Sequence, residues 1–379
     1  MKKALATILA LVMALSVTTM AWADDVAKID GTGYATLQEA VNAANNGQTI
    51  VLQSDVVLTA SLNVAVNKTV TLDLNSYKIT ADMNGPHMIC NAGNLTITDS
   101  SANKTGEIAK IGAETNFGYV IENHGTMTLD RCKISSTSVK SSAIENGWYT
   151  ASANTAGTSC TMTIQNAEVV SVNADGGLYT VKNDDYGVMV INGGVFTNSV
   201  AGAGAVLNWN DLTINGGTFT GASAVRTLKS GSSDFETGKS QIKNGTFNGG
   251  IDTLDGYKTG ITIAVTGGTF STDVKEYLAE GKILQKNGDT YTAVTNSGIT
   301  SGTYTSEPTV PSGYKATKND DGTWTVSKVS YYYYQPTTDT KTTDTKGSPK
   351  TFDAGIALYV GMALTSAAGV AFVGKKRED

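Results

Sequence analysis

The sequence contains few cysteines, prolines and histidines, and it has no excess of positive charge. Three cysteines in 379 residues cannot form a disulfide scaffold, and an odd number leaves one thiol unpaired within a monomer. The simplest role for Cys90, Cys132 and Cys160 is that of small buried apolar side chains. A formal net charge of −6 argues against nucleic acid as a partner and suits a soluble surface. Glycine is plentiful, and 41 glycines beside 5 prolines indicate many tight turns between strands.

The first 23 residues have the three parts of a secretory signal peptide. Lys2 and Lys3 give a positive start, residues 4–17 form an apolar core, and Ala21-Trp22-Ala23 is a small-x-small cleavage site. The apolar stretch is short for a permanent membrane helix and ends in two threonines. The sequence therefore predicts export.

The C-terminal end is typical of an anchor. Residues 354–374 carry no charge, and a helix of this length spans roughly 30 Å, the thickness of the hydrocarbon layer. The basic residues 375–377 follow directly and are expected on the cytoplasmic side. A buried core helix is the alternative, but this segment ends the chain after a low-complexity tract.

A short motif precedes this span. Ser348, Pro349, Lys350 and Thr351, followed by an apolar span and a basic tail, resemble the cell-wall sorting signal of Gram-positive surface proteins. The resemblance implies cleavage after Thr351 by a sortase-like transpeptidase and linkage to peptidoglycan. Phe352 stands where that family usually has glycine. Without cleavage, the expected outcome is a membrane-anchored protein on the extracellular face of a Gram-positive-type envelope.

The body of the chain repeats a short apolar segment that ends in Ile134, Val169, Phe196, Phe219, Phe247 and Phe270. These residues are separated by 35, 27, 23, 28 and 23 positions. A second element, an apolar pair followed by one variable residue and Asn, ends in Asn91, Asn123, Asn146, Asn183 and Asn208. Stretches of period 3.6, which a helical solenoid needs, are absent. Short β-branched strands with Asn or Gly-Gly corners at this period predict one coil of a parallel β-helix per repeat.

The repeat resembles the right-handed, pectin-lyase-like parallel β-helix family over roughly residues 30–270. The stacked asparagine amides are expected to form a ladder and the phenylalanines a continuous core. A capping box at residues 36–39 predicts an N-terminal cap helix, and a short helix is expected over 272–278. The fold class is therefore all-β: a right-handed single-stranded solenoid with a helical cap, a C-terminal hairpin region and a C-terminal transmembrane helix.

Five segments follow from these signals. They are a signal peptide (1–23), a parallel β-helix with its cap helix (24–270), a C-terminal cap and small β region (271–328), a Thr-rich stalk with the sorting-like motif (329–353), and a transmembrane anchor with a basic tail (354–379).

The best candidate for chemistry is the variable position before the repeated asparagines. On successive coils it reads Cys90, Glu122, Glu145, Lys182 and Leu207. Because its neighbours point inward, this column is expected to face outward, with the two glutamates about 5 Å apart. If the protein is a glycosidase or a lyase, Glu122, Glu145 and Lys182 are its expected catalytic residues. A calcium site is a further alternative. The simpler interpretation is a solvated ladder of charges, without cofactor or metal.

Aromatic residues suggest a binding face. An insertion after Asn146 carries Trp148 and Tyr149, Tyr186 follows on the next coil, and Trp209 follows a later asparagine corner. Insertions in a solenoid project on one face, and aromatic rings stack on sugars. Each ring could equally cover a coil end.

The motifs of polygalacturonases are missing, and only two histidines occur, His87 and His124. The sequence thus favours a non-catalytic adhesin or glycan-binding protein that contacts glycans or host or microbial surface molecules. A polysaccharide lyase or glycosidase using Glu122 and Glu145 is one alternative, and a structural spacer is another.

Overall fold

The structure is a computed structural model, and it describes residues 25–83, 87–112, 118–137, 141–148, 158–172, 179–229 and 238–330. The chain divides into two units, Met1–Val329 and Ser330–Asp379, and all elements named below belong to the first. The predicted signal peptide, stalk, sorting-like motif and membrane span lie outside the described residues. Within the ranges given, no helix is long and apolar enough to cross a membrane.

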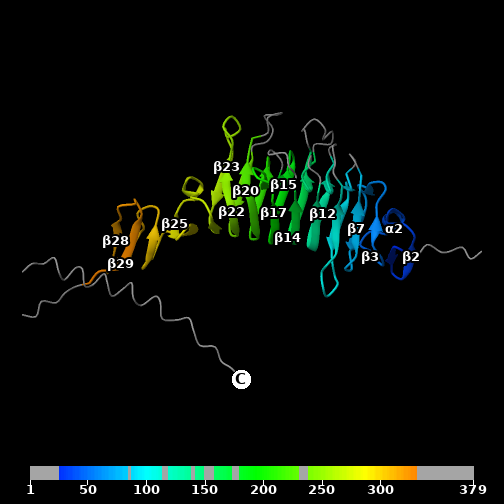
Figure 1. The fold of residues 1–379 in the computed structure, drawn as a ribbon, viewed down its shortest axis with the longest axis horizontal. Helices are drawn as coiled ribbons and strands as arrows, with labels where there is room; N and C mark the ends of the chain where they lie inside the picture. Colours follow the sequence, from blue (N-terminus) through cyan, green and yellow to red (C-terminus); the bar gives the residue numbers. More distant parts are fainter. Residues whose placement is uncertain are drawn as a thin grey trace, which may run out of the picture. The chain divides into compact units, whose positions relative to one another are not determined.

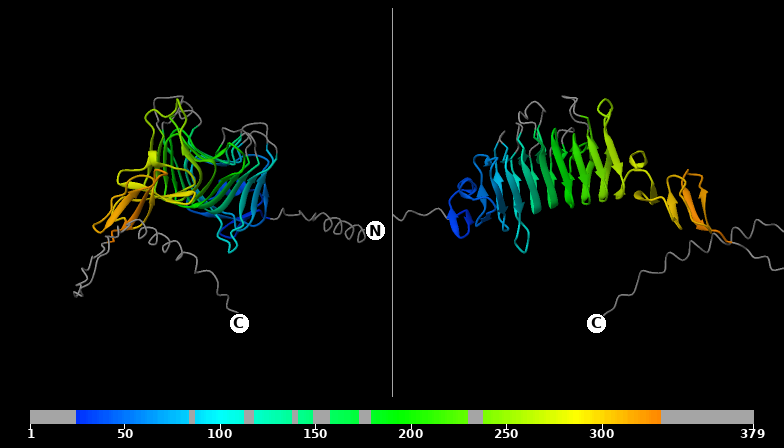
Figure 2. Two further views of the ribbon diagram at one scale, coloured as in Figure 1. Left: turned by 60° about the vertical axis from the view of Figure 1, so that its left-hand side comes forward. Right: turned by 180° about the vertical axis from the view of Figure 1, so that it is seen from behind.

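Parallel strands stack in chain order to form three ladders (Figures 1 and 2). The first ladder contains the strands that end in the repeated asparagines and their neighbours: β5 (Leu62–Val64), β8 (Ile89–Asn91), β11 (Ile121–Asn123), β13 (Ile144–Asn146), β15 (Tyr179–Asn183) and β18 (Gly204–Asn208).

The second ladder begins at the N-terminal end of the stack. It contains β3 (Thr49–Leu52), β6 (Thr69–Asp73), β9 (Asn94–Thr98), β16 (Gly187–Ile191), β19 (Asp211–Ile214), β21 (Lys239–Ile242) and β23 (Thr262–Val265). The third ladder contains β4 (Val56–Val57), β7 (Lys78–Ala81), β10 (Glu107–Lys110), β17 (Gly194–Asn198) and β24 (Thr269–Phe270).

Four longer strands each run through two ladders. β12 (Thr126–Ser136) and β14 (Cys160–Ser171) join the second ladder to the third, whereas β20 (Thr218–Thr227) and β22 (Thr246–Asp252) join the third to the first. Register shifts mark where β12 meets β14 and where β20 meets β22, because a strand that changes ladder must bend.

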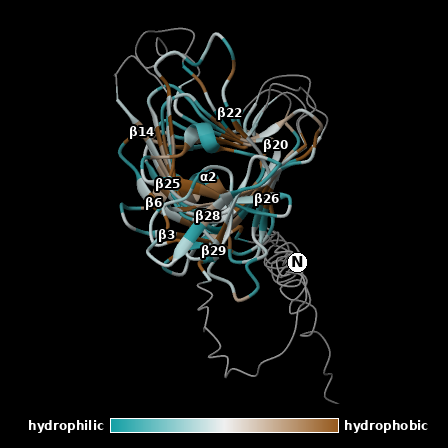
Figure 3. Ribbon diagram, turned by 90° about the vertical axis from the view of Figure 1, so that its left-hand side faces the viewer, coloured by the Kyte–Doolittle hydropathy of each residue, from teal (hydrophilic) through white to brown (hydrophobic). Residues whose placement is uncertain are grey.

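The core follows from the alternation of buried and accessible residues along these strands, which is interrupted where a strand bends. In β12 buried and accessible residues alternate, and the buried ones point into the coil. Viewed along the stack, hydrophobic and hydrophilic residues alternate along the strands (Figure 3). The rings of Phe196, Phe219, Phe247 and Phe270 are fully buried and stack nearly parallel, with centroids 4.9, 5.0 and 4.9 Å apart. The predicted phenylalanine column is confirmed.

The predicted asparagine ladder is also confirmed. Each amide donates to the next: Asn91 to Asn123 at 2.7 Å, Asn123 to Asn146 at 2.7 Å, Asn146 to Asn183 at 2.8 Å and Asn183 to Asn208 at 2.8 Å. The five side chains are buried, so each bond satisfies polar groups that water cannot reach. An all-β fold with stacked parallel strands, an asparagine ladder and a phenylalanine stack is consistent with a parallel β-helix.

Both ends of the stack carry other elements. At the N-terminal end, β1 (Ala27–Ile29) pairs antiparallel with β2 (Thr32–Tyr34) and β3, and α2 (Leu37–Ala43) follows. The predicted capping box is present: the hydroxyl of Thr36 accepts from Glu39 N at 3.2 Å, and the Glu39 carboxylate accepts from Thr36 N at 3.1 Å. Leu37, Ala40 and Val41 are buried, so α2 contributes an apolar face to the core.

At the C-terminal end the pairing becomes antiparallel. The predicted helix over 272–278 is a short 3-10 helix, η2 (Lys275–Tyr277). It precedes β25 (Lys282–Asn287), β26 (Thr290–Thr295), β27 (Gly302–Tyr304), β28 (Tyr314–Lys318) and β29 (Trp324–Lys328). β25 pairs with β26 and β28 with β29, as the predicted C-terminal hairpin region requires, and β26 also pairs antiparallel with β24.

Candidate functional site

The predicted column of variable residues is present on the first ladder. Cys90 pairs in register with Glu122, Glu122 with Glu145, Glu145 with Lys182, and Lys182 with Leu207. The same column continues to Arg226 and Asp252, which form a two-point ion pair with N–O distances of 2.6 and 3.0 Å. The register therefore places the two glutamates next to each other, as the repeat predicts.

The interpretation of this column as a solvated charge ladder is wrong. Glu145 is 1% exposed, and the side chain of Lys182 is 13% exposed. The alternation rule correctly directs both side chains out of the coil, but Tyr119 and Asp184, themselves buried, lie against them. Glu122, with a side chain 18% exposed, is the more accessible carboxylate of the two.

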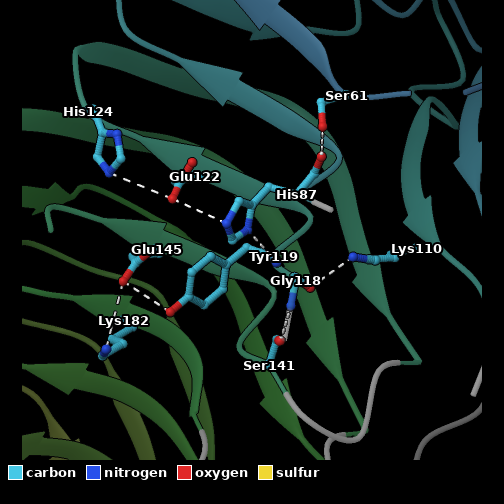
Figure 4. Close-up of polar contacts among 10 residues, drawn as sticks. All are labelled: Ser61, His87, Lys110, Gly118, Tyr119, Glu122, His124, Ser141, Glu145 and Lys182. Atoms are coloured by element: carbon cyan, nitrogen blue, oxygen red, sulfur yellow. Dashed lines mark hydrogen bonds and ion pairs between the residues drawn. The ribbon is translucent and has the colours of Figure 1, made fainter. Parts of the chain in front are cut away.

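Glu145 lies in a buried polar network. The hydroxyl of Tyr119 donates to Glu145 Oε1 at 3.0 Å, and Lys182 Nζ lies 3.7 Å from the same oxygen (Figure 4). Lys182 also forms an ion pair with Asp184. Burial, reinforced by the negative charge of Asp184 and opposed by Lys182, raises the pKa of Glu145 well above its ordinary value. At neutral pH this acid is therefore protonated.

Glu122 lies between the two histidines of the protein. Its Oε1 is 3.3 Å from His87 Nε2 and 3.8 Å from His124 Nε2 (Figure 4). The backbone N–H of Tyr119 donates to His87 Nδ1 at 3.0 Å, so the proton of the neutral imidazole is on Nε2 and faces Glu122. Burial, and then the charge of nearby Lys110, lowers the pKa of His87 to about 4. At neutral pH His87 is thus an uncharged hydrogen-bond donor.

Sequence reasoning missed this grouping of Glu122 with the two histidines. His87 lies just before β8, on the coil that precedes Glu122, whereas His124 lies just after β11, the strand that contains Glu122. The available signal was the alignment of the repeats, which puts both imidazoles at the ends of strands adjoining Glu122.

The aromatic residues separate into two places. The ring of Trp148 stacks on His124 with centroids 3.7 Å apart and planes 2° apart. Trp209 packs against Tyr179, Leu207 and Leu228 and meets Tyr257 edge-on at 6.1 Å. Tyr186 is partly buried with a left-handed backbone (φ 62°), and its carbonyl accepts from Cys160 N at 3.0 Å. Tyr149 lies outside the described residues.

A groove of about 390 Å³ opens beside the N-terminal part of the first ladder. The lining includes two amide side chains of α2, residues of the corner after β5 and the imidazole of His124. Its lining consists of Gln38, Asn42, Asn63, Val64, Ala65, Val66, Cys90, Asn91, Ala92 and His124. Burial lowers the pKa of His124, so the lining is uncharged at neutral pH.

The remaining predicted features are simple to place. Cys90, Cys132 and Cys160 are free thiols; the last two are buried and Cys90 is partly buried. Asp184 and Asp185 are buried, and Asp211 begins β19. In the described part of the chain, no group of three or more His, Cys, Asp and Glu side chains is arranged to hold a metal ion.

Comparison with known proteins gives no match: no family model, curated protein or solved structure matches this chain. The function is therefore inferred from the fold and from the contacts of the described residues.

Proposed function

We propose that this protein is a non-catalytic, glycan-binding parallel β-helix displayed on the outer face of a Gram-positive-type envelope. The observation that carries the proposal is the uncharged groove beside α2, whose lining combines amide side chains with small apolar side chains. Amides supply both donors and acceptors to hydroxyl groups, and small apolar side chains contact the faces of sugar rings. The expected ligand is accordingly a neutral oligosaccharide rather than a uronate or another charged polymer.

The end of the groove supports the same function. His124, which lines the groove, stacks on Trp148, and this contact holds the imidazole in one orientation. Flat aromatic groups contribute contact area at a small cost in conformational entropy, and this suits weak ligands such as sugars. Tyr149, Tyr186 and Trp209 belong to the binding face predicted from the sequence. Trp209 and Tyr257 form a second aromatic pair.

The burial and contacts of the two glutamates in the column favour binding over catalysis. A catalytic acid must reach the substrate, but Glu145 is already bonded to Tyr119 and lies near Lys182, with almost no exposed surface. Glu122 is more accessible and has a neutral imidazole as partner, and this one observation favours the alternative of a glycosidase or lyase. Sugar release that is lost in both Glu122→Gln and Glu145→Gln would establish that alternative.

The placement at the envelope derives from the ends of the chain. The signal peptide over 1–23, the motif from Ser348 to Thr351 and the span over 354–374 support export followed by retention. We also propose that the coils are right-handed and that the protein is related to pectin-lyase-like proteins. Surface proteolysis of intact cells, with and without Thr351→Ala and a truncation before residue 354, tests retention: linkage to the wall requires Thr351, whereas a membrane anchor requires only the span.

Two matched valines test the groove. Val66 lies in the groove and is 74% exposed, whereas Val57 lies outside its lining and is 72% exposed. Glycan-array screening identifies a neutral oligosaccharide, and titration calorimetry then compares Val66→Glu with Val57→Glu. The first change is expected to weaken binding at least about tenfold, or about 1.4 kcal/mol, and the second to leave binding unchanged. Equal affinities of the two variants, or a preference for uronates, would refute this binding site.

A further inference from the structure

The polar network around Glu145 has no part in the groove, and its composition is unusual. An amine, Lys182 Nζ, is in direct contact with a carboxylate oxygen, Asp184 Oδ2. The two side chains are 13% and 5% exposed, and the carboxyl group of Glu145 lies 3.7 Å from the same amine. An amine, a carboxylate and a second carboxyl group thus meet in a place from which most water is excluded.

We propose that Lys182 and Asp184 are joined by an intramolecular amide bond, which forms spontaneously with Glu145 as the proton-transfer group. The reacting atoms are Lys182 Nζ and Asp184 Cγ. The bond would be a covalent cross-link at the corner after β15. The polar network around Glu145, which takes part neither in glycan binding nor in core packing, would serve to form it.

The balance of the reaction needs no other reactant. The ammonium of Lys182 passes a proton through Glu145 to the carboxylate of Asp184, which leaves an uncharged amine and a carboxylic acid. The amine attacks Cγ and forms the N–C bond. The bond from Cγ to Oδ2 then breaks, Oδ2 leaves as water with protons relayed by Glu145, and Glu145 ends in the protonation state in which it began. The net change is ammonium plus carboxylate to amide plus water.

The contacts of Asp184 suit its two oxygens to different roles. Oδ1 accepts the backbone N–H of Asp185 at 3.0 Å, so a donor already faces the oxygen on which negative charge develops during attack. Oδ2 is buried and forms the ion pair with Lys182, and the carboxyl groups of Asp184 and Glu145 also interact with each other. Oδ2 is therefore the oxygen that can leave while the hydrogen bond from Asp185 to Oδ1 is kept.

Two effects favour condensation here over the ion pair that prevails in water. The amine and the carboxyl group belong to residues two apart on one corner and are already in contact, so the reaction gains the high effective concentration of an intramolecular step. The product also replaces two poorly solvated charges by a neutral amide, and burying such charges is costly. The raised pKa of Glu145 supplies the acid that proton relay requires.

The chain contains a matched pair that lacks these conditions. Lys258 Nζ lies 2.7 Å from Asp255 Oδ1, with side chains 60% and 95% exposed. Water solvates both charges there, and this pair is expected to remain an ion pair. It serves as the internal control.

Mass spectrometry of the purified, denatured protein tests the bond. The expected result is a mass below that of the processed chain by one water molecule, located by peptide mapping to the segment with Lys182 and Asp184. Trypsin is expected to cut after Lys258 and not after Lys182. A wild-type protein of full mass that is cut after Lys182 would overturn the proposal without any variant.

Variants separate this bond from other losses of water. An aspartate can also lose water by cyclising onto its own backbone, and that product would survive in Lys182→Arg. The amide bond predicts full mass for Lys182→Arg and, because relay is lost, full or nearly full mass for Glu145→Gln. Circular dichroism establishes that these variants are folded. A loss of water that persists in Lys182→Arg contradicts the cross-link.

Discussion

Replacement of Asn146 by alanine tests whether the buried amide ladder holds the coils together. Asn146 Oδ1 accepts from Asn123 at 2.7 Å, and its Nδ2 donates to Asn183 Oδ1 at 2.8 Å and to Val188 O at 3.3 Å. Each of the two short bonds contributes about 1 kcal/mol net, and leaving the fully buried oxygen of Asn183 without this donor costs a further 1–3 kcal/mol or so. We therefore expect Asn146→Ala to lower the free energy of unfolding by about 3–5 kcal/mol.

An exposed ladder on the same protein provides the control. Asn192 donates to Gln165 at 2.8 Å and accepts from Asn215 at 2.7 Å, in the same geometry but in contact with solvent. Water replaces those bonds in Asn192→Ala, so the expected cost is within about 0.5 kcal/mol. Urea unfolding followed by circular dichroism and by fluorescence gives both values, provided that the slope with urea is unchanged. Equal costs for the two variants would show that burial of the ladder is not what stabilises the coils.

Three further changes test the packing and the charges. Phe247→Ala removes a fully buried ring that stacks on Phe219 and Phe270. The lost burial of the ring and the cavity it leaves are together expected to lower the free energy of unfolding by about 3–5 kcal/mol, measured by urea unfolding. His87 has a folded-state pKa of about 4 against an ordinary 6.5, so the unfolded chain binds more protons between these values. Neutral His87 contributes its full stability above about pH 6.5, and this contribution is lost as the pH falls towards 4. In His87→Gln the free energy of unfolding should therefore change less with pH over this range. A pH dependence equal to that of the wild type would contradict the prediction. Gly147→Ala places a Cβ 2.6 Å from Asp185 O at φ 118°, and thermal melting should show a larger loss than in Gly202→Ala, where the backbone is also left-handed but no atom lies within 4 Å.

The coil and the contacts between equivalent positions on successive coils were predictable from the sequence, because the sequence pattern repeats from coil to coil. An asparagine or a phenylalanine at one position of each coil has a single set of neighbours, namely the same position on the coils before and after it. This is why the ladder from Asn91 to Asn208 and the stack from Phe196 to Phe270 form as predicted. The capping box at Thr36 was predictable for another reason: it is a local pattern that needs only four consecutive residues.

The surroundings of the column were not predictable in this way. Tyr119 and Asp184 lie in segments that do not repeat, so no alignment of the coils indicates what they contact. The helix α2 ends at Ala43 because Ala44 has left the helical conformation, with φ −57° and ψ 131°. The groove beside α2 likewise depends on how the cap meets the corner after β5, and residues far apart in the sequence determine that meeting.

Burial changes what the column can do, because it changes which protonation states are stable. Solvated, Glu145 and Lys182 would both be charged and would only screen each other. Covered by Tyr119 and Asp184, the glutamate holds a proton and the lysine is left in contact with a second carboxylate. That arrangement denies a substrate access to Glu145 and also removes the water that would otherwise keep an amine and a carboxylate apart. The same cover thus argues against hydrolysis at Glu145 and for condensation at Lys182, and it leaves the open, uncharged groove beside α2 as the place for a ligand.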